Sequence, residues 1–193
     1  MRTSEGQPSL SPVTHFLSGW VLANAAGLSR RDRAIVTLAC VVPDLDGIGA
    51  AAEVLTRHWA HPLTWFSDYH HLLHNAAFAM VVAGAAFALA SRRWQTAGFA
   101  LLAFHLHLLE DVAGSRGPAG DYWPVPYLLP FSHRSWTWSG QWELDSWQNI
   151  ALTGVLLLMT FWLAWGRGYS PLEMVSEKAD AALVGALRRR VAR

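Results

Sequence analysis

Two long uncharged segments limit most strongly what this chain can fold into. Residues 72–90 and residues 150–165 each contain only three positions that are not apolar, and none of these is an acid, a lysine or an arginine. Both segments approach the roughly 18 to 20 apolar residues that cross a bilayer as a helix. A third apolar run, residues 94–109, ends directly at Glu110 and Asp111. The chain is therefore predicted to be an integral-membrane protein built from helices.

Two shorter helices are predicted before these runs. Ser11 and Pro12 have the residue types of a helix N-cap and of a first helical position, so we expect a helix that continues to about Leu28. Residues 33–42 form a short apolar run that Pro43 and the acidic turn after it should stop. We therefore predict an all-α fold, an integral-membrane bundle of about five helices.

Long loops are predicted over residues 47–70 and 112–148, and they are rich in tryptophan. The chain has 11 tryptophans, and those in the two loops are Trp59, Trp65, Trp123, Trp136, Trp138, Trp142 and Trp147. Tryptophan prefers the membrane interface, and it also forms the core of loops that cover a binding site. Either interpretation places these loops over the polar end of the bundle.

The sequence changes character after Arg167. Residues 170–173, Ser-Pro-Leu-Glu, form a capping box with proline at the first helical position, and three consecutive arginines come shortly before the last residue. This pattern predicts an amphipathic basic helix that lies on anionic headgroups. We therefore divide the chain into a polar N-terminal tail (1–11), a membrane-embedded domain (12–166) and a cytoplasmic amphipathic tail helix (167–193).

Arginines in the predicted connections set the orientation of the bundle. If the helices alternate in direction, three arginine clusters fall at one end, which is cytoplasmic by the positive-inside rule. These clusters are Arg30, Arg31 and Arg33, then Arg92 and Arg93, and finally Arg167. The opposite end carries the histidines and acids described below. We predict a multi-pass protein of a bacterial inner membrane with its candidate metal site on the non-cytoplasmic side.

Composition excludes several classes of protein. Hydrophobic residues make up 52% of the chain and charged residues 15%, so disorder is excluded. The formal net charge is +1, which gives no reason to expect nucleic-acid binding. The single cysteine, Cys40, excludes a disulfide scaffold and a cysteine-based zinc site, so a metal would need His, Asp and Glu. The N-terminus carries no apolar run typical of a cleavable signal peptide.

Histidines and carboxylates at helical spacing point to metal chemistry. His107 and Asp111 are four residues apart, so both project from one face of a helix, and His70 and His74 share this spacing. Ionisable groups near a membrane cost several kcal/mol unless they are paired or functional. Imidazole and carboxylate without thiolate suit zinc, and also manganese or iron(II), as one or two ions. Further candidates at this end are His15, Asp44, Asp46 and His71.

Five short motifs in a fixed order carry a resemblance. The motifs are Thr14–Gly19, Val42–Asp46, His70–Asn75, His107–Asp111 and Trp123–Ser132. With these motifs the chain resembles, over residues 12–166, the LexA-regulated, membrane-bound predicted metal-dependent hydrolases. The order of their histidines and acids is also similar, more distantly, to that of the zinc ligands of phospholipase C and related single-strand nucleases, which suggests phosphoester substrates.

The resemblance implies a set of metal ligands and of supporting residues. Those implied as ligands are His15, Asp44, His74, His107 and Asp111. Asp46 could ligate, bridge two ions or orient a ligand. The family's His-Arg-x-x-Thr-His-Ser pattern is one residue shorter here and has His71 at the arginine position, which leaves the parts of His70 and His71 open. Glu110 is a candidate general base, and Arg116 is either a phosphate clamp or an exposed turn arginine.

These observations predict a membrane-bound metal-dependent hydrolase. Its expected substrates are phosphoesters or lipid-linked phosphates, its expected partners are membrane lipids, and its oligomeric state is left open. One alternative is a b-type haem or electron-transfer protein, although carboxylates beside a haem gain nothing from the iron. The other is a non-catalytic metal or proton transporter, which would need polar residues through apolar runs that have almost none.

Overall fold

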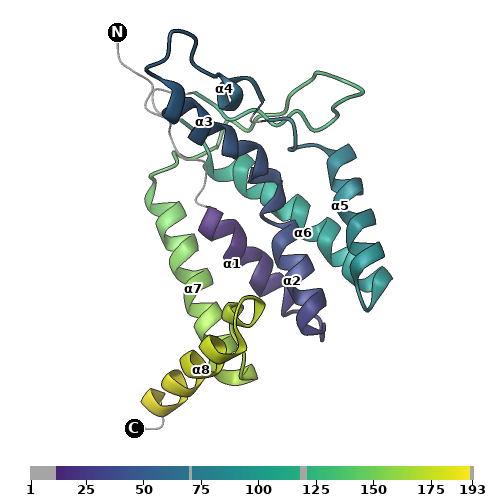
Figure 1. Ribbon diagram of the computed structural model, residues 1–193, viewed down its shortest axis with the longest axis vertical. Coiled ribbons are helices and arrows are strands. Elements are labelled where there is room, and N and C mark those ends of the chain that lie inside the picture. The colour runs from purple at the N-terminus through teal and green to yellow at the C-terminus, as the bar shows by residue number, and fades with distance from the viewer. Residues whose placement is uncertain (1–11, 70, 118–120, 192–193) are drawn as a thin grey trace.

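The computed structural model describes residues 12–69, 71–117 and 121–191, and all of the regular secondary structure in these ranges is helical (Figure 1). The prediction of an all-α fold is confirmed. Besides the helices, two isolated β-bridges join Arg116 to Glu143 and Val125 to Trp136. The elements are α1 (Pro12–Ala23), α2 (Arg30–Ala39), the 3-10 helix η1 (Val42–Ile48), α3 (Gly49–Thr56), α4 (Trp65–Tyr69), α5 (Ala76–Leu89), α6 (Arg93–Gly114), α7 (Trp147–Arg167), the 3-10 helix η3 (Pro171–Met174) and α8 (Glu177–Val191).

Helix α6 lies at the centre of the bundle, in contact with α1, α2 and α5, while α7 packs on the other side of α1. Small side chains let these helices approach closely, as shown by the buried alanines 23, 39, 86, 100 and 103 in the main core cluster. At Gly19 an added Cβ would lie 2.6 Å from the Cβ of Cys40. Glycine is therefore required where α1 crosses α2.

Two helices, α6 and α7, are long and apolar enough to cross a membrane, with 22 and 21 residues. A third span is formed if α2 and the continuous η1–α3 segment, which meet at a bend of 54°, count as one. The helix that forms from the apolar run over residues 72–90 is shorter than predicted. This helix, α5, begins only at Ala76, because the Asn75 side chain accepts a hydrogen bond from Phe78 N (2.9 Å) and caps the helix there.

The first helix also ends earlier than predicted. It stops at Ala23 instead of near Leu28, and the four residues that follow form a turn. The Asn24 side chain donates to Trp20 O (2.9 Å), and Ser29 then caps the start of α2 by accepting from Asp32 N (3.2 Å). Side chains of this kind compete with continued helix and favour helix ends, which explains the difference.

The helix predicted over residues 33–42 ends before Pro43 as expected, since α2 stops at Ala39, but the predicted acidic turn after Pro43 and the predicted loop over residues 47–70 are wrong. Pro43 stands in the first turn of η1, where the missing N–H is tolerated, and the helix continues from Ile48 into α3. The predicted loop also contains the short helix α4. The structure therefore has helices, α3 and α4, that were not among the five predicted for the bundle. In the second predicted loop, the described residues 115–117 and 121–146 contain turns and the isolated bridges but no regular helix or strand.

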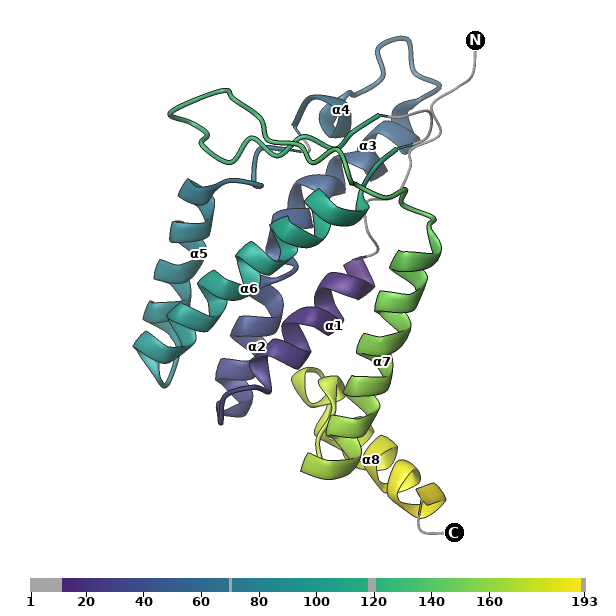
Figure 2. The same ribbon diagram turned by 180° about the vertical axis from the view of Figure 1, so that it is seen from behind.

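The segments that carry the arginine clusters lie at one end of the bundle, the lower end in Figures 1 and 2: the start of α2, the α5–α6 turn and the end of α7. The Asp32 carboxylate accepts from the backbone N–H groups of Ser91 (2.8 Å) and Arg92 (3.1 Å), which ties the start of α2 to the α5–α6 turn. Arg33 forms a two-pronged ion pair with Glu173 of η3, with both N–O distances 2.8 Å. The Trp-rich segments lie at the opposite end with α3 and α4.

The predicted capping box at Ser170 starts a short 3-10 helix rather than the tail helix. Ser170 Oγ accepts from Leu172 N (3.3 Å) as a cap does, but Glu173 pairs with Arg33 instead of returning to the cap. Helix α8 begins later, at Glu177. Ser170 also donates to Asp180 of α8 from both its N–H and its hydroxyl (2.6 Å each), so the tail is anchored by polar contacts.

Candidate metal centre

Five side chains from four segments converge at one buried point of the fold, between α1, η1, the start of α5 and α6. His15 is in the first turn of α1, Asp44 is in η1, His74 directly precedes Asn75 and α5, and His107 and Asp111 are on α6. Four of these residues are at most 1% exposed, and the Asp44 side chain is 9% exposed. The structure thus brings together all of the residues that the resemblance implies as ligands.

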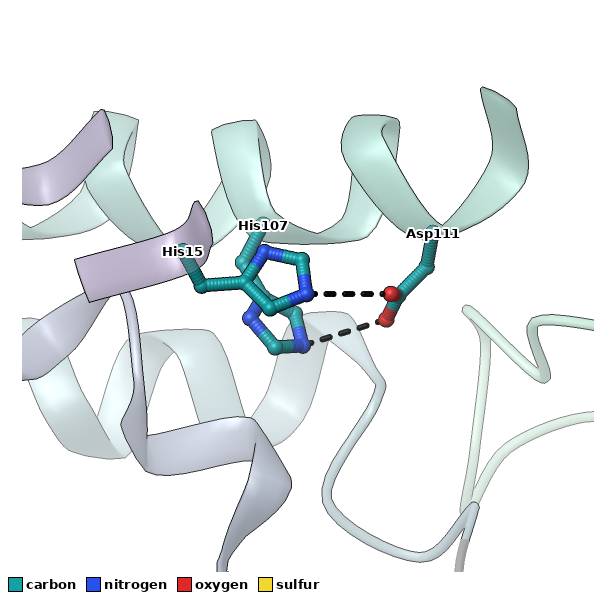
Figure 3. Close-up of side chains that lie close together, drawn as sticks. All are labelled: His15, His107 and Asp111. Carbon is teal, nitrogen blue, oxygen red and sulfur yellow. Dashed lines mark ion pairs between the residues drawn. The ribbon is translucent and has the colours of Figure 1, made fainter. Parts of the chain in front are cut away.

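The Asp111 carboxylate is the centre of this group. Its Oδ1 lies 3.3 Å from His15 Nε2, and its Oδ2 lies 3.1 Å from His107 Nε2 and 3.4 Å from His74 Nε2. Figure 3 shows the imidazoles of His15 and His107 side by side with their Nε2 atoms directed at the same carboxylate. Each of the three imidazoles therefore directs its Nε2 atom at the Asp111 carboxylate.

Asp44 completes the group from the other side. Its Oδ1 is 3.7 Å from His107 Nε2. The ligand atoms form two sets of three in which every atom lies within 4.8 Å of the others: His15, His107 and Asp111, and then Asp44, His74 and His107. Because His107 belongs to both sets, the five side chains form one connected cluster.

An outer partner holds each imidazole by its Nδ1. His107 Nδ1 donates to Cys40 O (2.8 Å), because a carbonyl can only accept, and a neutral ring with this proton on Nδ1 has its lone pair on Nε2. His15 Nδ1 donates to Glu110 Oε2 (2.7 Å), and His74 Nδ1 donates to Asp46 Oδ2 (3.2 Å). This is the arrangement that orients histidine ligands around metals and increases their basicity.

The charge distribution of the cluster is that of a site for a cation. Burial lowers the pKa of His74, but hydrogen bonds with Asp111 and Asp46 raise it more, to about 9. His74 Nε2 lies 3.3 Å from His107 Nε2, and two lone pairs cannot face each other at this distance without a proton or a cation between them. The raised pKa of His74 favours a proton on this ring in the metal-free protein.

Asp44 provides a second test of whether a metal fits. Both of its carboxylate oxygens are buried and make no hydrogen bond. Buried polar atoms in proteins almost always have a partner, and a carboxylate without one is costly. A divalent cation bound between Asp44 and the inward-facing nitrogens would provide that partner, so the residues fit a metal of the imidazole and carboxylate class.

The other predicted site residues take different places. Asp46 accepts from His74 and also from Leu73 N (3.1 Å), so it orients the His74 ring. Glu110 is buried between His15 and the hydroxyl of Ser18, which donates to it, so its carboxylate holds His15 instead of facing open space. Arg116 forms an ion pair with Glu143 (3.1 Å). His70 lies outside the described residues.

Some contributors were not found from the sequence. The Cys40 carbonyl and Ser18 are examples, as is Gln141, which is 1% exposed and donates to Asp111 O (3.0 Å). Gln141 also accepts from Trp123 N (2.7 Å), and the Trp123 ring packs against His71 with centroids 4.5 Å apart. A backbone carbonyl and a loop glutamine have no spacing signal, whereas Ser18 follows His15 on one helix face and could have been noticed.

Comparison with known proteins shows to which family the chain belongs. A search of curated proteins and a search of solved structures gave no match. A family model described as YdjM inner membrane protein matches residues 10–179, which covers α1 to α7 and all five clustered side chains. This match and the apolar helices α6 and α7 place the protein in a membrane. The chain belongs to the YdjM inner membrane protein family.

Proposed function

We propose that this protein is a metal-dependent hydrolase of the inner membrane. One observation carries the proposal: three imidazole Nε2 atoms and two buried carboxylates converge, while every Nδ1 is held by an outer acceptor. Such preorganised donor sets bind metals, and a purely structural polar cluster would satisfy its own acceptors. The proposed ligands are His15, Asp44, His74, His107 and Asp111.

The donor set decides the class of metal. Nitrogen and oxygen donors without sulfur suit zinc first, and manganese or iron(II) next. Bound there, such an ion lowers the pKa of water and polarises an ester or phosphoryl oxygen. One nitrogen lone pair binds one ion, and His107 belongs to both sets of three, so one ion is the simplest occupancy. A second ion would require Asp111 to bridge, since its two oxygens already face different histidines.

The chain's own residues then have separable roles. Glu110 and Asp46 hold His15 and His74 in place, and each keeps the proton of its histidine on Nδ1. Gln141 ties the long loop to the last turn of α6, next to Asp111. Arg116 has no part in this proposal, because its guanidinium is paired with Glu143.

The proposed substrates are phosphoesters, with lipids and lipid-linked phosphates favoured. The more distant similarity to the phospholipase C ligand order suggests phosphoesters, and the membrane location favours an amphiphile. Arginines gather at the end of the bundle away from the long loops, so the positive-inside rule favours a non-cytoplasmic site. Exposed tryptophans in the long loop, such as Trp136 and Trp138, are side chains suited to the membrane interface.

The test compares two histidines of the same helix. His107 is in the cluster, whereas His105 is bonded to Tyr127 Oη (2.9 Å) outside it. Purified protein in detergent should contain about one equivalent of a divalent metal by elemental analysis. His107→Ala should lose this metal and all turnover of a panel of phospholipids, prenyl phosphates and chromogenic phosphoesters. His105→Ala should retain both.

The same measurements expose the rival functions. A Soret band in the purified protein would replace the proposal with haem binding. Metal bound at the stated ligands without turnover of any substrate would leave metal binding or transport and remove hydrolysis. Equal metal content in His107→Ala and the wild type would overturn the ligand assignment itself.

A further inference from the structure

An apolar groove lies directly beside the candidate metal centre. It has a volume of about 500 Å³, within the range of small-molecule binding sites. It is formed where η1 and α3 pass α4 and the chain leading to α5. Its walls include Leu45, Ile48, Trp65, Tyr69 and Leu72.

The groove is shaped by a close approach of two helices. At Gly49, which also lines it, an added Cβ would lie 2.7 Å from Phe66 N and 2.8 Å from the carbonyl carbon of Trp65. Helices α3 and α4 therefore touch at this point and form a fixed floor. The geometry of the groove is thus part of the fold and does not depend on side-chain rotation alone.

One end of the groove meets the cluster. Among the described lining residues Asp46 is the one with a charged side chain, and its carboxylate holds His74 (3.2 Å) and Leu73 N (3.1 Å). Leu73 also lines the groove, and the next residue in the chain is the proposed ligand His74. A molecule lying in the groove would therefore have one end next to the metal centre and the rest against apolar walls.

The side chains that line the groove are apolar and yet exposed. Ile48 is 67% exposed, Trp65 53% and Leu72 51%. Tryptophan and tyrosine concentrate at the depth where headgroups meet hydrocarbon, and the groove contains one of each, Trp65 and Tyr69. The groove therefore has the composition of a surface that exchanges contacts with lipid chains.

We propose that this groove binds the hydrocarbon chain of the substrate, an acyl or prenyl chain, while the polar head of the same molecule lies at the metal centre. The proposal rests on the function proposed above and adds the part of the substrate that is recognised. A water-soluble ester would leave the apolar walls unused. An amphiphile matches both ends, because its hydrocarbon chain contacts the apolar walls while its polar head lies next to Asp46 and the cluster.

Photo-crosslinking tests this without relying on turnover. The probe is an alkyl phosphate with a diazirine in its chain, added to the purified full-length protein in detergent and followed by peptide mapping. We expect labels concentrated in peptides that contain residues 45–49, 65–69 and 72–73. Decyl phosphate and geranyl phosphate should compete for labelling, and the stronger competitor identifies the chain type. Methyl phosphate should not compete.

A matched pair of variants controls for general changes in lipid contact. Ile48→Trp narrows the groove, whereas Leu158→Trp makes the same addition at an equally exposed site of α7, since Leu158 is 70% exposed. We expect a several-fold loss of groove labelling in Ile48→Trp and none in Leu158→Trp, with metal content unchanged in both. Labels spread evenly over α6 and α7, or equal labelling in both variants, would overturn the proposal.

Turnover separates this proposal from the previous one. Groove labelling in a protein that hydrolyses no phosphoester would remove the hydrolase proposal and leave a lipid-binding groove. Hydrolysis of soluble phosphoesters that is unchanged by Ile48→Trp and by chain length would support the hydrolase and overturn the groove as a substrate site. Loss of long-chain turnover alone in Ile48→Trp supports both.

Discussion

Buried charges occur at both ends of this bundle, but their partners differ. At the arginine end, Arg33 and Glu173 are 8% and 6% exposed, and they satisfy each other through two hydrogen bonds of 2.8 Å. The remaining guanidinium nitrogen of Arg33 donates to Leu28 O (2.7 Å). At the other end, both oxygens of the buried Asp44 have no hydrogen bond.

This difference distinguishes a structural charge pair from a binding site. The Arg33 pair is complete within the protein and connects α2 to η3. The histidine cluster instead directs like atoms at one another, as His74 Nε2 and His107 Nε2 show at 3.3 Å. Only an added cation or proton resolves such an arrangement, so the incomplete end is the one to associate with function.

The largest expected effect on stability is that of a substitution at the arginine end, where the buried charges are paired. Arg33→Ala leaves Glu173 buried and unpaired, which should lower the free energy of unfolding by about 3–5 kcal/mol. The measurement is unfolding by SDS titration in mixed micelles. Metal content should not change, and the double variant Arg33→Met with Glu173→Leu should recover most of the stability. A loss of metal in the folded single variant would show that the two ends are coupled.

Removal of metal should have the next largest effect. A ligand present at 100 times its dissociation constant stabilises the folded state by about 2.7 kcal/mol. A chelator should therefore lower the melting temperature of the wild type, and zinc should restore it. His107→Ala should show no response to either addition. A chelator effect of equal size in His107→Ala would mean that the stabilising metal is bound elsewhere.

Asp44→Asn should have opposite effects on the stability of the metal-free and the metal-bound protein. Without metal, the amide replaces a buried charge that has no hydrogen bond, which should raise stability by about 1–3 kcal/mol. With metal, the variant should lose the zinc-dependent rise in melting temperature, because a ligand is gone. The comparison is made by melting curves with chelator and with zinc. A destabilised metal-free variant would show that Asp44 already has a partner in the fold.

A pH dependence of opposite sign is expected for metal-free and metal-bound protein. The raised pKa of His74, about 9 against 6.5, stabilises the metal-free fold below pH 6.5, and this contribution is lost as the pH rises towards 9. Metal binds the deprotonated imidazole, so its affinity should rise with pH by up to about tenfold per unit until pH 9. Isothermal titration with zinc between pH 6 and 9 measures this, and a flat profile would contradict it.

The helices that the sequence located best are those set by composition alone. The runs predicted over residues 94–109 and 150–165 correspond to α6 (Arg93–Gly114) and α7 (Trp147–Arg167). The less accurate boundaries depended on single polar contacts, such as the Asn75 cap that shortens α5 and the Asn24 and Ser29 contacts at the end of α1 and the start of α2. Apolar runs average over many residues, whereas one hydrogen bond can move a helix end.

For the candidate site, the sequence by itself determined residue types and one local pair, His107 and Asp111 at helical spacing on α6. Tertiary structure decided that His15 of α1 meets Asp111, because small residues let α1, α2 and α6 pack closely. It also decided which nitrogen faces inward, through acceptors such as Cys40 O that any residue could supply. The sequence determines which residues share a helix face, but contacts between residues about a hundred positions apart form only when the helices pack.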